Sequence, residues 1–109
     1  MSQASQYTGL EMTLVQGDIM EIHFVIKDID GKIQDLAGFS SIKFKYKKYG
    51  DGSTSELNGW LVDPANGKIG FDFALTGWEA TDYDCEIELK SGTEEITCPD
   101  IVLHIVSEL

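Results

Sequence analysis

Residues 83–106 have the sequence Y-D-C-E-I-E-L-K-S-G-T-E-E-I-T-C-P-D-I-V-L-H-I-V, and this stretch decides the fold. From Tyr83 to Lys90, apolar and polar residues alternate, which is the pattern of a β-strand with one buried and one solvated face. Ser91-Gly92 then supplies a two-residue turn signal, and the alternation resumes after it. A hairpin of two strands is hardly stable alone in water, so other strands must cover its apolar face.

The turn sets the register of this predicted hairpin. Counting outward from a two-residue turn pairs Lys90 with Thr93, Ile87 with Ile96, and Cys85 with Cys98. Further along the second strand, the apolar residues change parity at Pro99-Asp100. Because proline donates no hydrogen bond to a ladder, we predict a β-bulge at this point.

The predicted register places Cys85 and Cys98 opposite each other in the core. They are the only two cysteines in the chain, so they do not make the disulfide framework typical of small secreted domains. Two reduced, buried and unreactive thiols are the favoured interpretation, and a disulfide in an oxidising compartment is the alternative.

The rest of the chain supplies further strands. Turn signals such as Asp-Gly and Asn-Gly separate the candidate segments, and no segment has a sustained helical period. About seven short strands with frequent turns are typical of a two-sheet sandwich. The further candidate strands are residues 11–15, 19–27, 41–48, 57–62 and 68–74. The residues expected to form the core are Phe24, Phe44, Phe71, Tyr83 and Ile87.

Tyr83 gives a more specific indication, because it precedes Cys85 by two residues at the start of its strand. This spacing resembles the tyrosine corner of immunoglobulin-like domains. The sequence thus predicts an all-β, immunoglobulin-like antiparallel β-sandwich of about seven strands. Residues 11–109 would form this single domain, and residues 1–10, which are polar and without periodicity, a flexible N-terminal arm.

Composition excludes several classes of partner. The 109 residues have a formal net charge of −11, and the eight basic residues are all lysines. Phosphate backbones and anionic lipids would repel such a chain, so we expect no nucleic-acid partner and no membrane partner. No apolar run is long enough to span a membrane, and the N-terminus lacks the character of a signal peptide, so we expect synthesis in the cytoplasm.

Two rows of opposite charge are predicted to lie side by side. One strand presents lysines outward at every second position, and the strand that begins at Tyr83 presents carboxylates in the same way. The rows are Lys43, Lys45 and Lys47 on the first strand, and Asp84, Glu86 and Glu88 on the second. In an immunoglobulin-like sheet these strands are neighbours, so the charges would pair across the ladder and form a solvated face rather than a binding patch.

Few residues suggest catalysis or metal binding. His23 and His104 fall on the outward faces of different strands, and a metal pair would require those strands to be neighbours. Asp28-x-Asp30-Gly31 is similar to the opening of a calcium loop, but it lacks the closing glutamate, which favours a plain turn. No nucleophile elbow or phosphate-binding loop is present. We therefore expect a non-enzymatic protein without cofactor or metal.

Two features of the sequence are candidates for partner binding. The first predicted strand contains nothing that would block the addition of a partner strand. Trp60 and Trp78 lie in turn-rich regions, where they either cap an open end of the sandwich or stack on a sugar or protein. The candidate partner-binding residues are Glu11, Met12, Thr13, Leu14, Val15, Trp60 and Trp78.

The order of motifs resembles the immunoglobulin-like domains of tailed-phage tail and baseplate proteins, in particular the N-terminal domain of the baseplate upper protein family. The similarity spans roughly residues 12–106, and each motif combines turn residues with strand alternation. The motifs are L-V-Q-G-D at 14–18, D-I-D-G-K at 28–32, D-L-A-G at 35–38, D-P-A-N-G-K-I at 63–69 and Y-D-C-E-I-E at 83–88.

This resemblance implies a structural or attachment module of a phage or prophage virion, with no catalytic residues to transfer. We therefore expect a protein–protein interaction module whose partners are other tail or baseplate proteins, or further copies of itself. The alternative is a carbohydrate-binding or adhesion module that uses Trp60 and Trp78.

Overall fold

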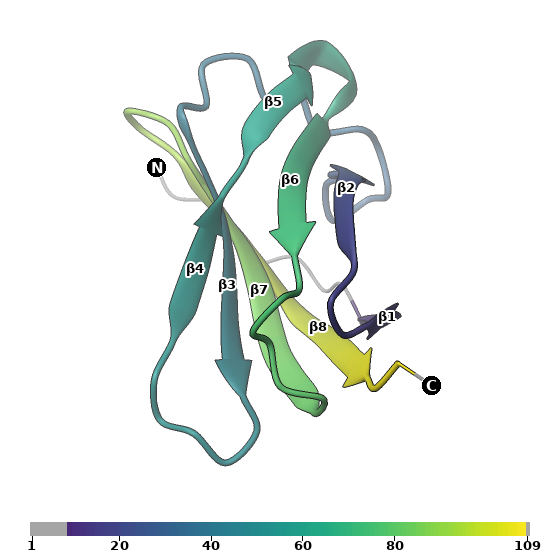
Figure 1. Cartoon of the computed structure of the whole chain (residues 1–109). Coiled ribbons are helices and arrows are strands. Elements are labelled where there is room, and N and C mark those ends of the chain that lie inside the picture. Colours follow the sequence, from purple (N-terminus) through teal and green to yellow (C-terminus); the bar gives the residue numbers. More distant parts are fainter. Residues whose placement is uncertain (1–8, 109) are drawn as a thin grey trace.

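Two β-sheets pack face to face in the computed structural model, which describes residues 9–108 (Figure 1). The elements are β1 Leu10–Val15, β2 Ile19–Val25, β3 Ser41–Lys48, β4 Ser55–Asn58, β5 Trp60–Asp63, the short 3-10 helix η1 Pro64–Asn66, β6 Lys68–Ala74, β7 Asp82–Lys90 and β8 Glu95–Val106. One sheet has the order β1-β8-β7-β3-β4 and the other the order β2-β6-β5. We call them sheet A and sheet B.

The expected all-β sandwich is confirmed. All strand pairs are antiparallel except that of β1 with β8, which is parallel. Eight strands are present rather than about seven, because the predicted strand at 57–62 is two strands that belong to different sheets. Leu10 already pairs in β1, and residues 1–8 of the predicted arm lie outside the described residues.

Aromatic rings fill the space between the sheets. Phe44 of sheet A lies 5.6 Å from Phe71 and 5.0 Å from Phe73, both of sheet B, measured between ring centroids. Phe44, Phe71 and the predicted core residues Tyr83 and Ile87 are buried. Phe24 contacts Phe44 and Phe71 but is only half-buried, because its strand, β2, lies at the edge of sheet B.

The tyrosine corner has the expected form. The hydroxyl of Tyr83 donates to the carbonyl oxygen of Glu79 (3.2 Å) and accepts from the amide of the same residue (3.0 Å). One side chain thus holds the chain that connects the two sheets where it enters β7.

The predicted register of the β7–β8 hairpin is wrong by two residues. Ser91 and Glu94 close a four-residue loop, in which the Ser91 hydroxyl accepts from the amides of residues 93 and 94. The strands therefore pair Lys90 with Glu95, Ile87 with Cys98, and Cys85 with Ile101. The two cysteines are diagonal neighbours, at a Cα separation of roughly 7–8 Å that is too long for a relaxed disulfide.

The bulge predicted at the proline is confirmed. Pro99 and Asp100 together stand opposite Glu86, since the register shifts between Cys85 and Ile87. Asp100 has φ +61°, the left-handed conformation that a short polar residue tolerates best after glycine. The bulge turns the apolar residues of the second half of β8 back toward the core.

Gly59 lies where the chain crosses from sheet A to sheet B. A Cβ atom at this position would lie 2.5 Å from the ring of Phe71 and 2.5 Å from the carbonyl oxygen of Gly70. Only glycine lets the chain pass this closely over the aromatic core.

We therefore expect Gly59→Ala to lower the free energy of unfolding by about 1–3 kcal/mol, the usual cost of overpacking. Gly52→Ala is the matched control, because a Cβ at that position meets nothing within 4 Å. Urea unfolding of both variants checks the prediction. Equal midpoints for the two would contradict the crossover geometry.

Candidate functional site: sheet edges, an apolar groove and a charged face

Strand β1 forms one edge of sheet A. The amide of Gln16 donates to the carbonyl oxygen of Val106 (2.8 Å), which sets the parity of this ladder. Residues at even positions therefore direct their N–H and C=O groups toward β8, and residues at odd positions direct theirs toward the other side. No strand pairs with that side within residues 9–108.

The candidate residues of β1 divide into two sets. Met12 and Leu14 pack against the core and anchor the strand. Glu11, Thr13 and Val15 have the backbone groups that face the free edge, and of these the carbonyl oxygen of Val15 already accepts from the amide of Asp18 (3.1 Å). Only the second set is placed to pair with a partner strand.

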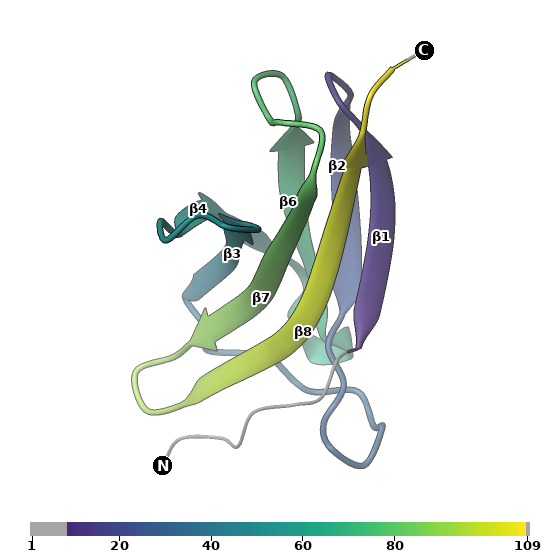
Figure 2. The ribbon, with the colours of Figure 1, turned by 90° about the horizontal axis from the view of Figure 1, so that it is seen from below.

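Strand β2 forms an edge of sheet B, on the same side of the sandwich as β1 (Figures 1 and 2). Asp18 accepts from the amide of Leu75, and the amide of Ile26 donates to Gly67, so even positions of β2 face β6. The backbone groups of Ile19, Glu21, His23 and Val25 consequently point away from the sheet. The sequence did not indicate this edge, because alternation of apolar and polar residues does not distinguish an edge strand from a central one.

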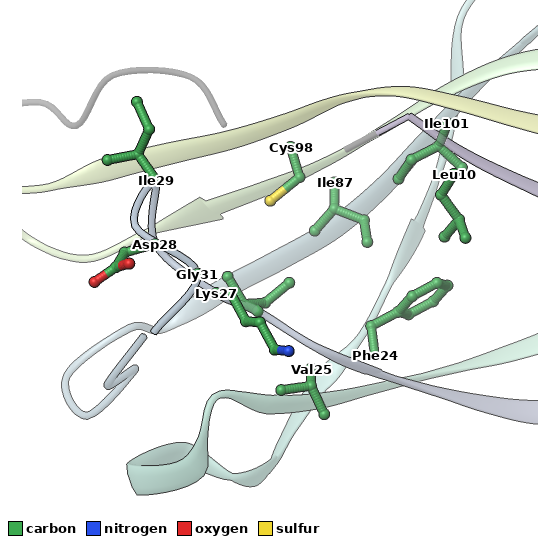
Figure 3. A pocket seen from close by; sticks show the side chains of 11 residues that line it. Leu10, Phe24, Val25, Lys27, Asp28, Ile29, Gly31, Ile87, Cys98 and Ile101 are labelled. Carbon is green, nitrogen blue, oxygen red and sulfur yellow. The ribbon is translucent and has the colours of Figure 1, made fainter. Parts of the chain in front are cut away.

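An apolar groove of about 440 Å³ opens between the two sheets beside these edges (Figure 3). Its walls include Leu10 from β1, Phe24 from β2, Ile87 from β7 and Ile101 from β8. Lys27 and Asp28 are among its polar lining residues. The groove shows that the core is not closed on the β1–β2 side.

The two candidate tryptophans do not share a surface. Trp60 is 36% exposed on the outer face of sheet B, where its indole lies over Gly70 next to His23. Trp78 stacks on Tyr46 with ring centroids 4.2 Å apart and packs against the core. Trp78 thus caps the end of the sandwich and is half-buried, and Trp60 is the more exposed of the two.

The predicted placement of the two charge rows side by side on the outer face of sheet A is confirmed, although the ion pairs themselves differ: Lys43 pairs with Glu56 of β4 and Lys45 with Glu88. Three pairs stand directly opposite each other across the ladder: Lys43–Glu88, Lys45–Glu86 and Lys47–Asp84. Glu88 is only 9% exposed and forms ion pairs with Lys45 (3.0 Å) and Lys90 (3.5 Å). Burial acts to raise the pKa of Glu88, but the two ammonium groups outweigh it and the pKa is lowered.

His104 links three strands on this same face. Its Nδ1 lies 2.6 Å from Asp82 of β7, and its Nε2 lies 3.2 Å from Glu11 of β1. Hydrogen bonds to Asp82 first and Glu11 second raise the pKa of His104. The two carboxylates bind different ring nitrogens, so they do not converge on a metal position. Sequence reasoning missed this cluster because it depends on the parallel pairing of β1 with β8.

The pKa of His104 predicts a pH dependence of stability. A raised pKa in the folded state gives stabilisation that is complete below the ordinary value of 6.5 and is lost as the pH rises through the folded-state pKa. We expect the stability advantage of the wild type over His104→Gln to decrease between pH 6 and pH 9. Urea unfolding at both pH values measures it, and an advantage that grows with pH would contradict the assigned contacts.

The two cysteines and the Asp28–Asp30 segment, which the sequence offered as further candidates for chemistry, have structural roles in the fold. Burial raises the pKa of Cys85 to about 12 and that of Cys98 to about 11, so neither thiol is a ready nucleophile. The carboxylate of Asp28 accepts from the amides of Asp30 and Lys32, which makes this segment a hydrogen-bonded turn. Among residues 9–108 no group of three histidine, cysteine or acidic side chains is arranged to hold a metal ion.

His23 and His104 lie in different sheets and do not meet, so they do not form the metal pair that neighbouring strands would have allowed.

Within the described part of the chain, no helix has the length and apolar character needed to cross a membrane. Comparison of the sequence with protein-family models, and with curated proteins, finds no match. Function must therefore be argued from the edges, the groove and the charged face.

Proposed function

We propose that this chain is a non-enzymatic protein–protein interaction module of a phage or prophage tail or baseplate, which binds its partners through strand edges. The observation that supports this proposal best is the pair of unpaired edges, β1 and β2, on one side of the sandwich beside an apolar groove.

Physical reasoning favours edges over faces as the binding surface. On the outer face of sheet A the lysine and carboxylate rows lie side by side, with Glu88 bound by Lys45 and Lys90, and the inner faces form the core. An edge strand, in contrast, offers a row of N–H and C=O groups to any extended partner segment. Natural proteins guard such edges with lysine or proline, and neither residue occurs in β1 or β2.

The assignment to a phage tail rests on the order of sequence motifs, which resembles the baseplate upper protein family. The net charge of −11 agrees with a partner that is a protein rather than a nucleic acid. The proposed location is accordingly the virion, with other tail or baseplate proteins, or further copies of the chain, as partners.

The test is whether purified particles of the encoding phage or prophage contain this chain in their tails. Thr13→Pro removes an amide on the free edge of β1 without removing a bond to β8, so we expect normal folding and reduced incorporation. Thr13→Val, which keeps the amide, is the matched control. Particles that lack the wild-type chain would contradict the proposal.

A sugar-binding module is the rival function, and the exposed indole of Trp60 is the feature that favours it. Glycan-array binding that is lost in Trp60→Ala and kept in Thr13→Pro would favour this rival over the edge-binding module.

A further inference from the structure

The core of the sandwich is incompletely covered along β2. The inward-facing side chains of β2 are Met20, Ile22 and Phe24, and their cross-strand partners on β6 are Phe73, Phe71 and Ile69. The three partners on β6 have no exposed surface, whereas the three on β2 are only half-buried. Another strand beside β2 would cover them.

The outward-facing residues of β2 are also unusual for a solvated edge. Ile19 is 76% exposed and Val25 is 50% exposed, one at each end of the strand. Between them lie Glu21 and His23, whose side chains contact each other within the strand. Along the outer face, the order is therefore apolar, acidic, basic, apolar.

This order is complementary to itself when the strand is reversed. In an antiparallel pair of two β2 strands with the two-fold axis at Ile22, Glu21 stands opposite His23 of the second copy, and His23 opposite Glu21. In the same register, Ile19 stands opposite Val25 of the second copy. Each pair joins side chains of compatible chemistry across the ladder.

The backbone independently supports this register. Free N–H and C=O groups belong to the odd positions of β2, so a second β2 must pair odd with odd positions. Moving the axis to Glu21 would place two glutamates opposite each other, and moving it to His23 would do the same with two histidines. Only the axis at Ile22 satisfies both the hydrogen-bond parity and the charges.

We infer that the chain self-associates through β2, so that the three-stranded sheets of two copies join into one continuous sheet. The occupant of the β2 edge is a second copy of this chain. The inference deepens the proposed function, on which it rests, by naming the partner of one edge. The net charge of −11 on each copy opposes association, which makes the dimer weak and stronger at higher ionic strength.

Three charge variants at positions 21 and 23 test this register. His23→Glu makes both positions acidic, and Glu21→Lys/His23→Lys makes both basic, so each variant opposes like charges to itself. Glu21→Lys/His23→Glu exchanges the charges and restores opposite pairs. In sedimentation equilibrium we expect the first two variants to dimerise on the order of tenfold more weakly than the wild type, and the exchanged variant to recover. Thr54→Glu adds a negative charge in the loop between β3 and β4, at the far edge of sheet A from β1, and is the control.

Mixing His23→Glu with Glu21→Lys/His23→Lys gives the decisive result, because dimerisation that returns on mixing shows that both variants are folded and that each lacked only a complementary partner. The mixture should form a heterodimer, although each variant alone dimerises more weakly than the wild type. Both variants keep a net negative charge, so only local pairing can join them.

The inference is overturned if the wild type is monomeric at about 1 mM, where even a Kd of 1 mM would give a visible dimer. It is equally overturned if the exchanged variant fails to recover or the mixture stays monomeric. A monomeric wild type whose incorporation into tails still depends on the β1 edge would remove this inference and leave the proposed function standing.

Discussion

The contact of Phe44 with Phe71 and Phe73 is the interaction on which the rest of this structure depends. These rings join sheet A to sheet B with centroid distances of 5.6 and 5.0 Å, and all three are completely buried. Because β6 contributes two of these rings, the segments that pass close to β6 need small residues at the points of contact. The chain crosses between the sheets at Gly59, where a side chain would strike Phe71.

The same core explains where the molecule is open. β6 lies in the middle of sheet B and is covered on both sides, but β2 has no strand beyond it among residues 9–108. The groove beside Leu10 and Phe24 lies on this uncovered side. On the outer face of sheet A, Lys45 and Lys90 form ion pairs with Glu88. On the same face, His104 of β8 contacts Glu11 of β1 and Asp82 of β7. The edges at β1 and β2 are therefore the surfaces best suited to bind a partner strand.

The sequence predicted those features that depend on local pattern. Alternation located the strands, the proline in β8 located the bulge, and Tyr83 before Cys85 indicated the corner. The lysine row was placed correctly because cross-strand charges add to the alternation. Features that depend on a single turn or on tertiary contact were not predicted. The hydroxyl of Ser91 stabilises a four-residue loop, so the cysteines do not face each other.

The candidate site could be predicted only in part for the same reason. Residues 11–15 were expected at an edge, and the free side of β1 agrees with that expectation. The edge at β2 was not anticipated, since no local signal shows how many strands join each sheet. Trp78 looked equivalent to Trp60 in the sequence, and only packing against Tyr46 distinguishes them.

Hydrogen exchange of the β2 amides, followed as a function of protein concentration, tests the central claim most directly. In dilute solution the amides of Ile22 and Phe24, which face β6, should be protected, and those of Glu21 and His23 should exchange quickly. At about 1 mM protein the second pair should become protected as dimers form. Protection of Glu21 and His23 at every concentration, or at none, would contradict an open β2 edge that a second copy closes.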